Sequence, residues 1–293
     1  MANRFHQRQL CWALLSSALL LITPVACSAN HPSLAINGID LANLEAEDIQ
    51  RLLNSDVVYL GEQHDSEADH AAQLEIIEFM YAENPDIAIA FEMFQRPFQP
   101  VLDRYLAGEI SEAELVTQSE YEQRWGFPWE FYAPFLRFAQ ENQLPVLALN
   151  APSEITRQVA REGLDSLEGD DFRYIPPLSD IDTSNADYQA FVQEAFASHG
   201  SHGNFNFDNF FAAQVIWDET MAETIADFKQ TSPDTLVIVL AGKGHVMYGY
   251  GIPDRVARRL GDSLQQTKVL LNFPEEFLTD SPDEMADIFW YSE

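Results

Sequence analysis

Short apolar runs that end in polar residues recur along this chain and predict buried strands. Four of them occupy residues 57–60, 87–91, 146–149 and 236–240, and a fifth covers residues 268–273. Continuous apolar runs of this length are typical of strands that are covered on both faces of a parallel sheet. The run at 236–240 contains no polar residue, so we expect it near the centre of the sheet.

Segments with apolar residues three or four positions apart separate these runs and predict helices. Ser111 and Glu114 have the spacing of a capping box, and Ser153 and Gly163 are a typical helix start and end. The alternation indicates an α/β fold, with a mostly parallel open sheet flanked by helices. A further short strand is expected at residues 34–36. The predicted helices cover residues 46–53, 68–84, 112–119, 129–142, 153–163, 210–229 and 253–261.

A helical, aromatic-rich insertion is expected at residues 94–132, where Trp125 and Phe127 begin a dense cluster of large aromatic residues. Such a cluster is more typical of a core than of a ligand platform, and the alternative is an apolar lid over a cleft. Residues 165–208 are the least regular part and predict an insertion or a mobile loop. In that part, histidines and phenylalanines could cover a flat apolar ligand, or belong to a solvated loop with its aromatics tucked beneath. These residues are His199, His202, Phe205 and Phe207.

The N-terminus has the parts of a secretory signal peptide, predicted over residues 1–26. Two arginines precede an apolar run at residues 10–22, which is shorter than the ~20 residues of a membrane span. Cys27 lies where a bacterial lipoprotein is cleaved and acylated, and ordinary cleavage near Ala26 or Ala29 is the alternative. We therefore expect an exported, membrane-anchored lipoprotein of the bacterial envelope, facing the periplasm or the exterior, with residues 27–293 as a single domain.

The net charge of −31 excludes the usual nucleic-acid-binding proteins, because a phosphate backbone requires a basic face. Cys11 lies within the predicted signal peptide. The mature chain would then hold Cys27 as its sole cysteine, and this excludes an internal disulfide or a cysteine metal site.

Polar residues follow four of the predicted strands and point to one shared site. Glu62 and His64 follow the first strand, Glu92 the second, Asn150 the third and His245 the fourth. The carboxyl ends of parallel strands meet at one edge of a sheet, where ligands bind. Such a set could bind a divalent metal, or it could hold a general base between carboxylates.

Other residues lie near this predicted crevice. Lys243, Tyr248 and Tyr250 follow the fourth strand in a glycine-rich segment that allows close backbone approach. His70 either contributes to the site or only begins a helix. The chain has neither a G-x-x-x-x-G-K-[ST] phosphate loop nor a G-x-S-x-G nucleophile motif.

Between residues 57 and 259 the chain resembles the ChaN family of bacterial haem-binding lipoproteins, part of a broader group with erythromycin-esterase-like and Tiki-like proteins. The resemblance implies an α/β fold, a lipid anchor and participation in haem or iron uptake. It also implies that haem lies between two copies and that a tyrosine binds its iron. The segments that carry it are GEQHDSEADH, IAIAFEMFQRPFQPVLDRYLAGEIS, WEFYAPFLRFAQENQLPVLALNAP, WDETMAETI and AGKGHVMYGYGIPDRVAR.

The resemblance places the iron ligand at Tyr248, with Tyr250 beside it and His64 or His245 as alternative ligands. Haem propionates require cations, and Lys243 and the arginines at 255, 258 and 259 are the nearest in sequence. We therefore expect a haem-binding protein that forms a homodimer around its ligand, rather than an enzyme.

By analogy with the broader group, the alternative is a metal-dependent hydrolase. His64 and His245 would then hold or activate water, and Glu62 or Glu92 would act as the base. In that case these four residues would be the metal ligands.

Overall fold

The computed structural model describes residues 35–36, 39–40, 44–198, 206–261 and 263–292. Within these residues, no helix has both the length and the apolar character that a membrane span requires. The predicted signal peptide, Cys27, His199, His202 and Phe205 lie outside the described residues.

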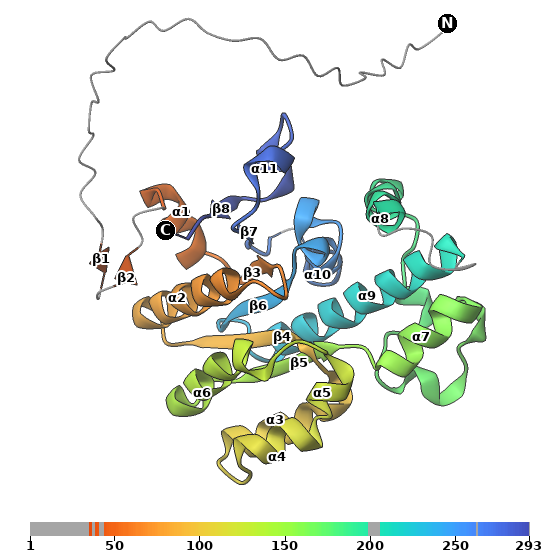
Figure 1. The fold of residues 1–293 in the computed structure, drawn as a ribbon, viewed down its shortest axis with the longest axis horizontal. Helices are drawn as coiled ribbons and strands as arrows, with labels where there is room; N and C mark the ends of the chain where they lie inside the picture. The colour runs from red at the N-terminus through yellow and green to blue at the C-terminus, as the bar shows by residue number, and fades with distance from the viewer. Residues whose placement is uncertain (1–34, 37–38, 41–43, 199–205, 262, 293) are drawn as a thin grey trace, which may run out of the picture. The chain divides into compact units, whose positions relative to one another are not determined.

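A six-stranded parallel sheet with the order β5-β4-β6-β3-β7-β8 forms the framework of the fold (Figure 1). This confirms the predicted α/β class and the central place of β6, which lies between β4 and β3. A separate antiparallel pair is formed by β1 and β2. The strands are β1 (Ala35–Ile36), β2 (Ile39–Asp40), β3 (Val57–Glu62), β4 (Ile87–Gln95), β5 (Val146–Asn150), β6 (Leu236–Gly242), β7 (Gln266–Leu271) and β8 (Ile288–Trp290).

The helices connect and flank these strands. The α-helices are α1 (Ala46–Leu53), α2 (Glu67–Glu83), α3 (Gln99–Leu106), α4 (Glu112–Gln118), α5 (Tyr121–Arg124), α6 (Ala133–Asn142), α7 (Ser153–Glu162), α8 (Ala186–Ser198), α9 (Phe207–Thr231), α10 (Ile252–Leu260) and α11 (Pro282–Met285). The 3₁₀ helices are η1 (Arg96–Phe98), η2 (Trp129–Phe131), η3 (Leu164–Ser166), η4 (Gly169–Arg173), η5 (Leu178–Asp180), η6 (Lys243–His245), η7 (Met247–Gly249) and η8 (Glu275–Phe277).

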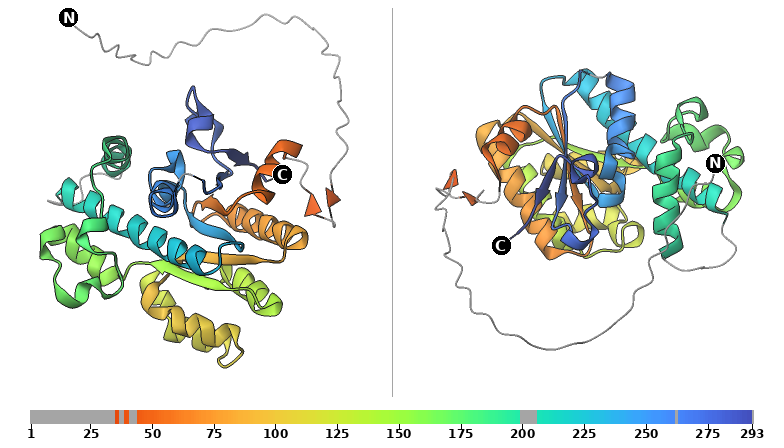
Figure 2. Two further views of the ribbon diagram at one scale, coloured as in Figure 1. Left: turned by 180° about the vertical axis from the view of Figure 1, so that it is seen from behind. Right: turned by 90° about the horizontal axis from the view of Figure 1, so that it is seen from above.

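The two faces of the sheet bury separate apolar clusters, because successive side chains of a strand point to opposite faces. In β3, Val58 and Leu60 pack in the cluster that α2 and α6 cover, while Val57 and Tyr59 pack in the cluster that α9 and α10 cover. Figure 2 shows these two helical layers from behind and from above. Burial on both faces explains the continuous apolar runs of the central strands.

Several predicted boundaries differ from the structure. β3 continues past its predicted end at residue 60 to include Gly61 and Glu62, and β4 continues past its predicted end at residue 91 with a register shift in its pairing with β5. Ser153 is the first residue of α7 and not its N-cap. The capping box of Ser111 and Glu114 is confirmed.

The described part of residues 165–208 is a packed insertion rather than a mobile loop. Short 3₁₀ helices and α8 form a third apolar cluster with α7 and α9, which includes Ile175, Tyr188 and Val192. Phe207 begins α9. The expected strand at residues 268–273 is also confirmed, but it begins earlier, at Gln266.

Candidate functional site

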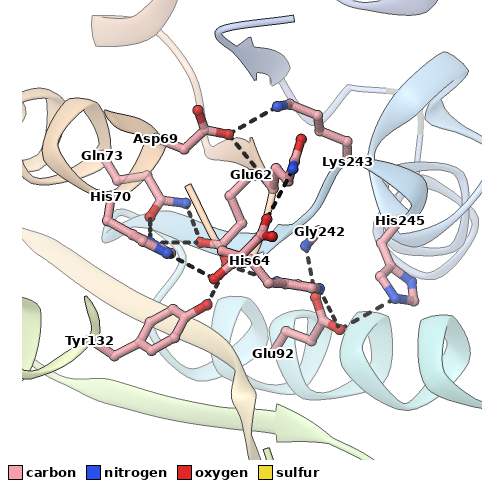
Figure 3. A network of polar contacts seen from close by, with 12 residues as sticks. Glu62, His64, Asp69, His70, Gln73, Glu92, Tyr132, Gly242, Lys243 and His245 are labelled. Atoms are coloured by element: carbon pink, nitrogen blue, oxygen red, sulfur yellow. Dashed lines mark hydrogen bonds and ion pairs between the residues drawn. The ribbon is translucent and has the colours of Figure 1, made fainter. Parts of the chain in front are cut away.

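The ends of β3, β4 and β6 bring the predicted site residues together, as Figure 3 shows. Glu62 pairs with Gly242 in the register of β3 and β6. His64 Nε2 lies 4.0 Å from Glu92 Oε1, and His245 Nε2 lies 3.4 Å from the same oxygen. The two imidazoles therefore lie beside one carboxylate, which confirms the convergence expected from the sequence.

A second carboxylate holds the other nitrogen of each ring. His64 Nδ1 lies 2.8 Å from Glu62 Oε1, and His245 Nδ1 lies 2.6 Å from Asp218 Oδ1. We call these five residues the His–carboxylate cluster: Glu62, His64, Glu92, Asp218 and His245. A carboxylate on Nδ1 fixes the orientation of an imidazole and favours its charged form.

The charges of the cluster are mutually stabilised. Burial opposes ionisation of Glu92, but His245, His64 and the bond from the Gly242 amide outweigh it and lower its pKa to about 2. Burial opposes protonation of His245, but Glu92 and Asp218 raise its pKa to about 10. Burial likewise opposes protonation of His64, but Glu92 and Glu62 raise its pKa. His245 is therefore cationic at neutral pH, and Glu92 is anionic.

Glycine at position 242 allows the cluster to close. The Gly242 amide donates a hydrogen bond of 2.8 Å to Glu92 Oε2. A Cβ atom at this position would lie 2.8 Å from His64 Nε2, closer than side-chain atoms approach one another. Gly242 thus permits both the backbone bond to Glu92 and the position of the His64 ring.

Glu62 is buried, and both of its carboxylate oxygens accept hydrogen bonds from residues of this chain. Tyr132 Oη donates to Oε1 at 2.5 Å, and Gln73 Nε2 donates to Oε2 at 2.7 Å. His70 Nε2 lies 3.1 Å from the His64 carbonyl oxygen, and its Nδ1 lies 3.5 Å from Glu62 Oε2. His70 thus belongs to the network, and Glu62 orients His64 rather than presenting a free oxygen to a ligand.

The ligand set expected for a divalent metal is not supported by this arrangement. Among the described residues, no group of three or more His, Cys, Asp or Glu side chains could hold a metal ion. Asn150 Nδ2 donates to the Glu92 carbonyl oxygen at 2.9 Å and so stabilises the end of β4. Each imidazole of the cluster already has two carboxylate partners.

The aromatic residues of the 94–132 insertion serve both the core and the site. Trp125, Trp129 and Phe131 pack against the α2 and α6 cluster, as expected for a core. Trp125 and Phe127 also contact the His64 ring, at centroid distances of 4.8 Å and 5.2 Å. With 26% of its side chain exposed, His64 is the member of the cluster that solvent reaches most.

The cations expected to receive propionates are paired with buried carboxylates. Lys243 Nζ lies 2.9 Å from Asp69 Oδ2. Arg255, Arg258 and Arg259 all contact Glu219, at distances of 3.2, 2.5 and 2.7 Å. The arginine contacts join η5, α9 and α10, so in this structure the three arginines stabilise the fold.

Sequence analysis missed the acids of α9 and the residues that support Glu62. Nothing in the sequence analysis singled out Asp218 or Glu219, and both are fully buried. The signal in the sequence was that the apolar residues of this helix lie on all of its sides, which is typical of a buried helix. Acids in a buried helix require partners. The supporting residues that were not expected are Gln73 and Tyr132, which donate to Glu62, and Asp69, which accepts a hydrogen bond from the neighbouring Gln63 amide.

Tyr248 lies outside the His–carboxylate cluster, in η7. Its backbone has a φ of 57°, a left-handed conformation that is rare for a residue with a side chain. Its ring stacks on Tyr250 at 5.2 Å and meets the edge of Phe191 at 5.7 Å. Burial raises its pKa, and Glu194 and Glu284 raise it further. Within the described residues, its hydroxyl group makes no hydrogen bond.

Comparisons with known proteins agree with this fold. The chain is similar to the protein RETICULATA-RELATED 5, chloroplastic, of Arabidopsis thaliana, with 26% identity over 269 residues, which is 83% of this chain. The chain spans only 35% of the length of that relative. The structure of ChaN of Campylobacter jejuni, described for cofacial haem binding, matches with a TM-score of 0.62 and 20% identity, covering 84% of this chain and 91% of that one.

A lower similarity is found to a mutant of the erythromycin esterase EreC in its open conformation, with a TM-score of 0.46 and 14% identity, over 77% of this chain and 72% of that one. It carries no argument about activity. The family described as "Haem-binding uptake, Tiki superfamily, ChaN" matches residues 49–256, which include every member of the His–carboxylate cluster and Tyr248. The chain therefore belongs to the ChaN family of the Tiki superfamily.

Proposed function

We propose that this chain binds ferric haem through Tyr248 and takes part in haem or iron uptake. Its membership of a family described as haem-binding uptake supports this function. The fold that it shares with a ChaN protein described for cofacial haem binding supports it as well. The family resemblance suggests Tyr248 as the ligand, and the geometry of this chain supports that choice over the two histidines.

The observation that carries the assignment is the difference between Tyr248 and the two histidines. His64 and His245 are each held on Nδ1 by a carboxylate, and both Nε2 atoms face Glu92. Iron could bind His64 or His245 only if contacts between that imidazole and its carboxylate partners were broken. Tyr248 has a partly exposed phenol with no such partner among the described residues.

The surroundings of Tyr248 fit a porphyrin. The rings of Tyr250 and Phe191 extend the aromatic surface beside the phenol, and a porphyrin gains from contact with flat apolar groups. The left-handed backbone of Tyr248 costs about 1 kcal/mol, and such a cost is often retained at binding sites. Tyrosinate is a hard anionic ligand and stabilises ferric iron.

Haemin titration of the purified protein tests this function. We expect a Soret shift with the charge-transfer band of ferric tyrosinate, and its loss in Tyr248→Phe. Tyr250→Phe is the matched control, because it removes a neighbouring hydroxyl group from the same stacked pair. An unchanged haemin spectrum with the wild-type protein would reject haem binding. A tyrosinate spectrum that persists in Tyr248→Phe would reject this ligand.

We further propose that haem lies between two copies of the chain. The description of cofacial haem binding in the Campylobacter jejuni protein supports such an arrangement. Light scattering coupled to gel filtration, with and without haemin, should show a monomer that becomes a dimer on loading. A monomer that retains bound haem would reject this part of the proposal.

Export and lipid anchoring at Cys27 complete the proposal, and they rest on the N-terminal sequence. Mass spectrometry of the protein extracted from membranes should show a diacylglyceryl group on Cys27 and no residues before it. Cys27→Ala should release the protein from membranes. A mature chain that begins at another residue would reject the anchor.

A further inference from the structure

We infer that the Tyr248 surface selects a ferric porphyrin by its iron and its flat apolar face, and disfavours anionic groups on the porphyrin edge beside this chain. This inference rests on the proposed function, and it names the class of porphyrin preferred. A ferric porphyrin with esterified propionates should bind at least as well as haem. The carboxylates of two helices near Tyr248 carry the argument.

The first acids belong to α8. Asp187, Phe191 and Glu194 are spaced by four and three residues, so they share one face of this helix. Phe191 lies in the middle of this stripe and contacts the Tyr248 ring at 5.7 Å. The face of α8 that meets the proposed haem ligand therefore has an exposed carboxylate on either side of its aromatic contact.

A further acid comes from the C-terminal part of the chain. The short helix α11 packs against η7, the element that contains Tyr248. Glu284 of α11 is exposed and acts electrostatically on both Tyr248 and Tyr250, as Glu194 does on Tyr248 and Asp187 on Tyr250. Three carboxylates from α8 and α11 thus make the electrostatic potential around the stacked tyrosines more negative.

The cations next to Tyr248 in the described part of the chain do not offset these acids. Lys268 runs beside Gly249, with its Cδ 3.8 Å from the position of a Cβ there, but its Nζ lies 3.3 Å from Asp287. Arg255 bonds the carbonyl oxygens of Tyr250 and Gly251 and is paired with Glu219. A propionate near Tyr248 would therefore meet carboxylates and cations that are already neutralised.

The ligand's own charge makes this inference measurable. Ferric haem with two ionised propionates carries a net charge of −1, whereas its dimethyl ester carries +1. Repulsion between exposed charges is screened by salt, over ~30 Å at 10 mM and ~3 Å at 1 M. Haem affinity should therefore rise with salt, and the affinity of the dimethyl ester should fall.

The experiment measures the affinity of haemin and of its dimethyl ester at low and high salt for two double variants. Glu194→Gln/Glu284→Gln removes two of the three acids near Tyr248. We expect it to raise haemin affinity at low salt by about three- to tenfold, and to leave ester affinity unchanged or lower. Glu78→Gln/Glu141→Gln is the matched control, because these exposed acids of α2 and α6 lie on the other side of the sheet. This control variant should change the affinity for haemin and for its ester by less than twofold.

Lys268→Met/Asp287→Asn tests the competing arrangement, in which a propionate displaces Asp287 and binds Lys268, and it removes both members of the ion pair so that the local net charge stays the same. We expect its haemin affinity to match that of the wild-type protein. A loss of affinity for haemin but not for the ester in the Lys268 variant would overturn the inference. An unchanged haemin affinity in Glu194→Gln/Glu284→Gln would overturn it as well. In both cases the tyrosinate spectrum of the wild-type protein would remain, so the proposed function would stand. Failure of both porphyrins to give that spectrum would remove the function and the inference together.

Discussion

His245 Nδ1 lies 2.6 Å from Asp218 Oδ1, although 27 residues separate them and Asp218 is fully buried within α9. This contact joins the end of β6 to the helix that covers one face of the sheet. Because a buried charge is stable only with a partner, each residue depends on the other. The first two predictions concern this contact and the pairing of His245 with Glu92.

Asp218→Asn should lower the pKa of His245 and reduce the free energy of unfolding by about 3 kcal/mol, because a buried imidazolium loses one of its two counterions. Urea denaturation measures the stability, and NMR titration of labelled histidine measures the pKa. Asp227→Asn changes an exposed acid of the same helix and should have little effect. Equal losses in the two variants would contradict the role given to Asp218.

The cluster should contribute most to stability between pH 4.5 and pH 6.5. The stabilisation from Glu92 is complete above its unfolded pKa of 4.5 and is lost as the pH falls toward about 2. That from His245 is complete below its unfolded pKa of 6.5 and is lost as the pH rises toward about 10. Urea denaturation across this range should show a shallower acid limb in Glu92→Gln and a shallower alkaline limb in His245→Gln. An alkaline limb unaltered by His245→Gln would show that the charge pair does not form.

Gly242→Ala should displace the His64 ring and destabilise the fold by about 1–3 kcal/mol, because its Cβ would lie within 2.9 Å of two atoms of that ring. Gly244→Ala is a close control, since a Cβ at that exposed position meets no atom within 4 Å. Denaturation midpoints and the His64 NMR signals provide the comparison. A His64 signal that is unchanged in Gly242→Ala would argue against the closed cluster.

Glu219→Gln should destabilise the fold by about 3 kcal/mol or more, because three arginines lose a buried counterion. Glu223→Gln, one turn later on α9, breaks a partly exposed pair with Arg96 and should cost about 1 kcal/mol or less. Thermal unfolding of both variants tests the difference. If the two were equally stable, the arginines near Glu219 would be free to bind an external anion.

Haem affinity should increase with pH, because Tyr248 must lose a proton to bind iron and its pKa is raised by burial, Glu194 and Glu284. One released proton predicts a gain of about tenfold per pH unit below that pKa. The slope should be absent in Tyr248→Phe and present in Tyr250→Phe, as measured by haemin titrations from neutral to alkaline pH. A flat profile in the wild-type protein would place the iron on another ligand.

Local sequence signals predicted the sheet because its strands are buried on both faces and are therefore apolar without interruption. The first strand was predicted to end at residue 60, but Gly61 belongs to it and allows close packing, since a Cβ there would lie 2.9 Å from Leu270 Cδ2. The strand β8 has three residues and a partly exposed Phe289, too little for a pattern to reveal. Strand length and exposure thus set the limit of the prediction.

The sequence predicted those residues of the site whose positions are determined by the parallel strands. Glu62 and Glu92 lie at or near the carboxyl ends of β3 and β4, and His245 follows β6. Since β3 and β4 both pair with β6, the convergence of these residues follows from topology. Asp218 comes from α9, whose rotation about its own axis depends on long-range packing, and Tyr132 comes from the turn between η2 and α6. Sequence spacing does not show which of the other elements these two residues face.

Because Glu92 is shared by two imidazoles, the ends of three strands cannot be redesigned one at a time. A larger residue at the tip of β6, or a shorter acid at position 92, would remove one of the two carboxylate partners of a neighbouring imidazole. Attempts to graft a new ligand into this edge would have to replace the whole set together, whereas Tyr248 of η7 and the neighbouring Tyr250 can be altered separately.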